Sequence, residues 1–172
     1  MFILQRNDYP GFSLIELLII IAITAVMLVV AVPSFISYLQ LNRLRGTVQQ
    51  QYYSLQYARS EAVKRNSNVY VTFQTGDSWC YGMNVGSVCN CSTPSGCGLG
   101  VVKAPKAQQL TLSTSGILAS TIQFEPTHGA ANASGLITFT LYGQTTSMSV
   151  KMGRLGNVII CSSSITGYQS CS

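Results

Sequence analysis

Gly11-Phe12-Ser13-Leu14-Ile15-Glu16 opens an almost uninterrupted apolar segment that ends just before Pro33, and this stretch decides the fold. At 1.5 Å per residue, a helix over Phe12–Val32 is about 30 Å long, the thickness of the hydrocarbon core of a bilayer. The only ionisable side chain of the segment is Glu16, and a carboxylate within a bilayer costs roughly 2.5–3.5 kcal/mol. The segment is therefore either a poor membrane anchor, or Glu16 has a partner that compensates for this cost.

The segment lacks the cleavage site of a secretory signal peptide. A signal peptide has small residues at a cleavage site after its apolar region, but Ala22, Ala25 and Ala31 lie inside the run and no A-x-A site follows it. We therefore expect a membrane helix that stays attached. Arg6 predicts that the N-terminus remains on the cytoplasmic side, so the rest of the chain is expected on the far side of the membrane.

The helical pattern continues beyond Pro33, where we expect a kink. Apolar residues recur at spacings of three and four and form one stripe: Leu41, Leu44, Val48, Tyr52, Leu55, Ala58 and Ala62. Glu61 is placed to pair with Arg65, one turn later. The spacing predicts one helix over Phe12–Arg65, about 80 Å long, whose second half packs on a domain.

After Asn68 the apolar period changes from 3.6 residues to two, which indicates strands. Residues 69–74 and 79–85 alternate and predict a hairpin, whereas 86–100 is rich in Gly, Ser and Cys and predicts a loop. Further strands are expected near 108–113, 117–125, 136–142, 146–152 and 156–161. Short antiparallel strands packed on a helix stripe predict an α+β fold.

The six cysteines all follow the apolar segment and form an even set: Cys80, Cys89, Cys91, Cys97, Cys161 and Cys171. This pattern predicts disulfides in an oxidising compartment. A zinc site is the alternative, but Cys89-x-Cys91 is spaced too closely and His128 is distant in sequence, so we expect no metal.

Six cysteines allow 15 connectivities, so the sequence alone leaves the pairing open. Cys161 and Cys171 bracket the C-terminal tail and are expected to pair. Cys89 and Cys91 are too close to pair comfortably with each other, so each is expected to find Cys80 or Cys97.

Composition indicates a secreted or assembling protein, and the distribution of charge argues against a nucleic-acid-binding surface. Charged residues make up only 9% of the chain and hydrophobic ones 47%, which is typical of secreted and assembling proteins. The formal charge is +5, yet the basic residues form no dense cluster of the kind that binds nucleic acid.

No catalytic motif is present in the sequence. It contains no G-x-S-x-G elbow and no Gly-rich phosphate loop. His128 with a serine, or Glu125 with Asp77, would be the candidates, but 125–129 is better explained as a turn in which Gly129 adopts positive φ. We therefore expect neither an enzyme nor a cofactor.

Gly11-Phe12-Ser13-Leu14-Ile15-Glu16-Leu17 resembles the class III signal of type IV pilins and type II secretion pseudopilins. The resemblance implies that prepilin peptidase cleaves after Gly11 on the cytoplasmic side of the inner membrane and that Phe12 is then N-methylated. It also implies that other pilin subunits are partners, because Glu16 of one subunit can compensate the N-terminal amine of a neighbour. The alternative is that Glu16 snorkels to the lipid headgroups.

Residues 55–65 (LQYARSEAVKR) are similar to the helix end of the GspH/FimT/FimU group of minor pilins and pseudopilins. Trp79 with Gly82, the stretch 124–129 and Gly153-Arg154 fall where this group carries comparable motifs. The Cys-rich stretch 86–100 departs from the group's simpler pattern.

Some members of the FimT group bind DNA through a Gly-Arg-x-Arg pattern near the C-terminus. Here the sequence reads Gly153-Arg154-Leu155-Gly156, so the second arginine is missing. One or two cations give weak, salt-sensitive binding. Lys151 and Arg154 are the candidate DNA-binding residues, and the alternative is that Arg154 is an exposed turn residue.

We therefore expect a prepilin leader (1–11), a transmembrane and filament-core helix (12–33), its amphipathic continuation (34–66) and a β-rich periplasmic domain (67–172). The function expected is that of a minor pilin of a type IV pilus, anchored in the inner membrane by one span and later part of the filament. Two alternatives remain: a minor pseudopilin of a type II secretion system, and a DNA-capturing minor pilin for natural transformation.

Overall fold

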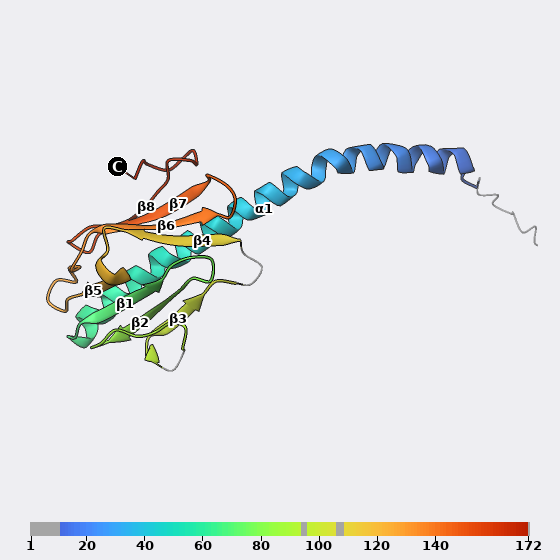
Figure 1. Ribbon diagram of the computed structural model, residues 1–172. Coiled ribbons are helices and arrows are strands. Elements are labelled where there is room, and N and C mark those ends of the chain that lie inside the picture. The colour runs from blue at the N-terminus through green and yellow to red at the C-terminus, as the bar shows by residue number, and fades with distance from the viewer. Residues whose placement is uncertain (1–10, 94–95, 106–108, 172) are drawn as a thin grey trace, which may run out of the picture. The chain divides into compact units, whose positions relative to one another are not determined.

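A computed structural model describes residues 11–93, 96–105 and 109–171 of the chain (Figure 1). The expected leader up to residue 10, with Arg6, lies outside the described residues. The chain divides into two compact units, Met1–Leu39 and Gln40–Ser172. One helix, α1 (Leu14–Arg65), begins in the first unit and ends in the second, within two residues of the bounds that the periodicity predicts.

The first unit consists of the apolar part of α1. This part is long and apolar enough to cross a membrane, with a mean hydropathy of 3.0, and none of that stretch is buried within the protein. Two of its hydroxyls bond to the helix itself: Thr24 Oγ1 donates to the Ile21 carbonyl (3.0 Å) and Ser37 Oγ to that of Pro33 (3.1 Å). Polar groups that would be costly in lipid are thereby satisfied locally.

The second unit packs the rest of α1 on two antiparallel sheets (Figure 1). The first sheet has the order β3-β2-β1-β5, formed by β1 (Val69–Gln74), β2 (Cys80–Val85), β3 (Gly100–Lys103) and β5 (Thr121–Phe124). The second has the order β4-β6-β7-β8, formed by β4 (Leu110–Ser115), β6 (Gly135–Leu141), β7 (Ser147–Met152) and β8 (Val158–Cys161). The α+β prediction is confirmed.

The predicted helix stripe is the part of α1 that enters the core. Leu44, Val48, Leu55, Ala58 and Ala62 are fully buried, and Leu41 and Tyr52 are partly buried against the same cluster. Gln51 lies in the same buried row, between hydrophobic neighbours. The predicted pair is also present, because Arg65 Nε lies 2.5 Å from Glu61 Oε2.

One loop prediction and one strand prediction were wrong in detail. Residues 86–100 were expected to be a loop throughout, but Gly100 begins β3, and residues 118–120 of the expected strand 117–125 form a 3₁₀ turn, η2 (Leu118–Ser120). β3 has four residues, too few to show a period of two, and it is fixed by pairing with β2, where Lys103 faces Cys80. Residue 108, the first of the expected strand 108–113, lies outside the described residues.

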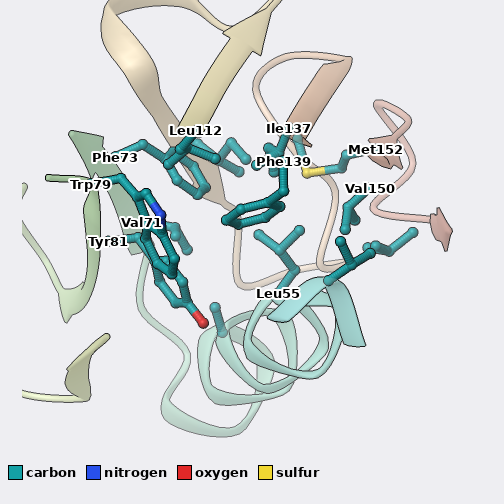
Figure 2. Close-up of a cluster of buried hydrophobic side chains, with 14 of the residues drawn as sticks. Leu55, Val71, Phe73, Trp79, Tyr81, Leu112, Ile137, Phe139, Val150 and Met152 are labelled. Atoms are coloured by element: carbon teal, nitrogen blue, oxygen red, sulfur yellow. The ribbon is translucent and has the colours of Figure 1, made fainter. Parts of the chain in front are cut away.

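Trp79 joins the two sheets at the centre of the core (Figure 2). Its indole lies parallel to the ring of Tyr81 (centroids 6.3 Å apart) and meets the edge of Phe139 from the second sheet (5.2 Å). Its Nε1 donates to the Leu110 carbonyl at 2.9 Å, so the indole is buried without an unsatisfied donor.

Tyr81 gives the core a pH-sensitive component. Its hydroxyl lies 3.1 Å from Ser54 Oγ of α1, and burial raises the pKa of Tyr81 to about 12. The unfolded phenol has a pKa near 10, so the stabilisation is complete below pH 10 and is lost as the pH rises through 12. We expect the unfolding free energy of the detergent-solubilised chain to fall by about 2 kcal/mol between pH 9 and 12 from this group alone. Urea unfolding across this range should show a smaller decline in Tyr81→Phe, and equal declines would contradict the assignment.

Candidate functional site

The N-terminal site is a carboxylate at the start of an uncovered apolar helix. Gly11 and Phe12 are exposed and precede α1, so the predicted cleavage junction lies in non-helical chain that a peptidase can reach. Glu16 lies exposed in the first turn of α1, where the helix dipole favours a negative charge. The neighbouring Leu14, Ile15 and Leu17 are all more than half exposed. Such a surface requires lipid or other helices to cover it.

The six cysteines form three disulfides, and none is free in the described parts of the chain: Cys80–Cys91, Cys89–Cys97 and Cys161–Cys171. The expected pairing of Cys161 with Cys171 is present. Cys89 and Cys91 each find one of the two expected partners. The same described residues hold no group of three or more His, Cys, Asp or Glu that could bind a metal ion.

The Cys80–Cys91 disulfide fastens the Cys-rich loop to β2, and the Cys89–Cys97 disulfide, which lies within the loop, packs on the outer face of the same strand. Tyr81 and Met83 point into the core, so the position of Gly82 between them faces outward. A methyl group on Gly82 would overlap the Sγ of Cys97 and lie 2.9 Å from the Sγ of Cys89. The absence of a side chain at Gly82 therefore lets the Cys89–Cys97 bridge lie directly on β2.

Arg59 of α1 holds two distant loops together. Its Nε donates to the Gly129 carbonyl (3.0 Å), and its Nη2 lies within reach of the carbonyls of His128 (3.5 Å) and Leu155 (3.4 Å). These carbonyls belong to the β5–β6 loop and to the β7–β8 turn. Gly129 has a φ of 64°, as the turn prediction requires. The sequence did not identify this role, because its partners are backbone atoms far along the chain.

Replacing Arg59 by alanine is expected to lower the unfolding free energy by about 2 kcal/mol, because three carbonyls lose a charged donor. Arg59→Lys should recover only part of this loss, since an ammonium group cannot match the planar guanidinium. Urea unfolding of the detergent-solubilised chain measures both. Gln49→Ala, on an exposed position of the same helix, is the control, and an equal effect of the two alanine variants would contradict the role of Arg59.

The two candidate DNA-binding residues, Lys151 and Arg154, differ in their exposure, and the second arginine of the Gly-Arg-x-Arg pattern has no equivalent. Lys151 lies half-buried in β7, and Arg154 is exposed in the following turn. Gly156, where the second arginine of the pattern would stand, has a φ of 75°, and a methyl group there would overlap the carbonyl oxygen of Gly129. The fold therefore leaves no room for a second arginine at that position.

Two family models match the chain. The model of the type II transport protein GspH matches residues 47–156, and the model of the prokaryotic N-terminal methylation motif matches residues 6–32. No curated protein matches the chain.

Two crystal structures share the fold, both of the type IV minor pilin FimU of Pseudomonas aeruginosa (strain PAO1), in different space groups. The likeness to the first covers 78% of this chain and 99% of the crystallised chain, with 20% identity and a TM-score of 0.58. The likeness to the second covers 75% and 100%, with 20% identity and a TM-score of 0.54. At this identity the likeness concerns the fold alone.

Proposed function

Because this chain belongs to the GspH family of type II transport proteins, we propose that it is a minor pilin of a type IV pilus. In this proposal the precursor resides in the inner membrane through the first half of α1, with the second unit in the periplasm. Prepilin peptidase cleaves it after Gly11, Phe12 is N-methylated, and the mature chain enters the filament. The match to the N-terminal methylation motif supports the processing steps.

The observation that carries the proposal is the uncovered apolar half of α1. Large side chains are exposed along it, among them Val26 (70%) and Val29 (75%). Hydrophobic burial is worth roughly 25 cal/mol per Å², so this surface must be covered wherever the protein resides. Lipid covers it before assembly, and the equivalent helices of neighbouring subunits cover it in the filament.

Glu16 supplies the specificity of this packing. An apolar helix alone can slide against its neighbours, whereas a buried carboxylate fixes the register in which its partner charge is reached. The methylated amine of Phe12 on an adjacent subunit is a cation at the same end of the helix. The pair forms when the helix leaves the lipid, so each charge offsets the desolvation of the other.

The pilus is favoured over the type II secretion pseudopilus by two features. The fold is shared with a type IV minor pilin, and three disulfides with few charges suit a subunit exposed at the cell surface. A minor pseudopilin of the secretion system is the alternative.

Intact-mass analysis of sheared pili tests the proposal. The expected result is the full chain beginning at a methylated Phe12 in the sheared pilus fraction. A chain that keeps its leader and stays in the membrane fraction would contradict it. Loss of the chain from this fraction when the secretion pseudopilins, but not the pilins, are deleted would favour the alternative.

A further inference from the structure

An exposed surface lies in the second unit, where α1 ends at Arg65. It is separate from the apolar part of α1, which belongs to the first unit and to which we assign the helix packing of the filament. Arg59 lies at the centre of this surface, and the side chains around it point away from the protein. Leu155 and His128 are 80% exposed, Lys64 is 77% exposed and Val63 is 50% exposed. We term these residues, together with Arg154, the Arg59 corner.

The backbone of the Arg59 corner is held in place before any partner arrives. Arg59 joins the β5–β6 loop to the β7–β8 turn, and the Ala131 amide donates to the Arg154 carbonyl at 2.8 Å. Within the loops, the Gly129 amide donates to the Glu125 carbonyl and the Gly156 amide to that of Gly153. A preorganised surface loses little conformational entropy on binding, so the exposed Leu155 is a low-cost anchor.

The charges of the corner are unevenly balanced. Glu61 accepts both Arg65 (2.5 Å) and Lys64 (3.5 Å), and the hydrogen bond from Arg65 lowers the pKa of this carboxyl. Arg59 donates to neutral carbonyls, and no carboxylate of the described residues is paired with it. Glu125 adds a second carboxylate, 3.8 Å from His128 Nδ1. Arg154 is exposed nearby, so four cations (Arg59, Lys64, Arg65 and Arg154) outnumber the two carboxylates Glu61 and Glu125 around an apolar centre. A partner that brings a carboxylate beside an apolar side chain complements this arrangement.

We propose that the Arg59 corner is a docking surface for another subunit of the same filament, which it meets through a segment that places an acidic residue beside an apolar one. The identity of the partner as a filament subunit rests on the proposed function; the chemistry of its segment rests on the corner itself. Nucleic acid fits less well. Leu155, which is 80% exposed, offers nothing to a phosphate, and Gly156 excludes a second arginine.

Site-specific photo-crosslinking of the full chain in cells that assemble the filament tests this surface. Leu155→p-benzoylphenylalanine is expected to give one discrete adduct with a filament subunit, identified by mass spectrometry. The control is Val88→p-benzoylphenylalanine, another exposed apolar position (60% exposed) on the Cys-rich loop, which should not give this adduct. Adding Arg154→Glu should reduce the adduct at position 155 at least fivefold, whereas Lys103→Glu, an exposed cation on β3, should leave it unchanged.

Three results would overturn the docking surface: no adduct at position 155, an adduct that nuclease removes, or an adduct with a protein outside the filament. The abundance of the unsubstituted chain in sheared filaments is measured in the same strain. A chain that is present in filaments but gives no adduct at position 155 rejects the surface and leaves the proposed function standing. A chain that is absent from filaments rejects the proposed function instead.

Discussion

The Glu16→Ala chain is expected to be at least tenfold less abundant in sheared filaments than the wild-type chain. Removing one partner of a buried ion pair costs about 3–5 kcal/mol, and each 1.4 kcal/mol is a factor of ten in an equilibrium. The substitution also removes the cost of about 2.5–3.5 kcal/mol that the carboxylate incurs in lipid, so it stabilises the membrane-embedded state at the same time. Both effects shift the chain from the filament to the membrane. Immunoblots of the sheared and membrane fractions measure the shift.

Two further variants separate charge from other effects. Glu16→Gln keeps the size of the side chain without its charge and should show a similar loss. Asp77→Asn neutralises an exposed carboxylate in the β1–β2 turn, outside the Arg59 corner, and should be incorporated normally. The Glu16→Ala chain should still be cleaved after Gly11, which would show that insertion and processing are intact. If it enters filaments at the wild-type level, Glu16 merely reaches the headgroups and has no role in assembly.

The parts of this fold that were predictable from sequence are those with a long repeating signal. The stripe from Leu41 to Ala62 repeats over several turns, so both its helix and its buried face follow from spacing alone. The alternation of Met148, Val150 and Met152 located β7 within one residue. β3 could not be found in this way, because four residues on a sheet edge carry no period and depend on β2 for their conformation.

The candidate sites also differ in how far they could be predicted, according to whether their residues are close together or far apart in sequence. Gly11, Phe12 and Glu16 lie within six consecutive residues, so a local motif was sufficient to single them out. The role of Arg59 depends on carbonyls of residues 128, 129 and 155, and backbone atoms have no sequence signature. The cysteines fall between these cases. The closeness of Cys89 and Cys91 restricted the pairing, but only the fold decided which of them bonds to Cys97.

The Gly82→Ala variant is expected to lose about 3 kcal/mol of unfolding free energy, at the upper end of the range for overpacking. The added methyl group would overlap the Sγ of Cys97 and crowd that of Cys89, and both sulfurs are fixed by their mutual bond. A flexible side chain would move aside at low cost, but here the Cys-rich loop must lift from β2 as a whole. The core residues Tyr81 and Met83 on either side prevent the strand from moving inward.

Urea unfolding of the detergent-solubilised chain, with disulfides intact, measures this loss. Gly46→Ala is the matched control, because a methyl group there meets no atom within 4 Å and should stabilise the helix by about 1 kcal/mol. The same substitution is therefore expected to have opposite signs at two glycines, because Gly46 lies in a helix with open space beside it and Gly82 lies in a strand beneath a disulfide. Alkylation followed by mass measurement should detect free thiols in a fraction of the Gly82→Ala chain and none in Gly46→Ala. If Gly82→Ala is as stable as the wild-type chain and remains fully oxidised, the Cys89–Cys97 bridge does not lie against β2 in the folded protein.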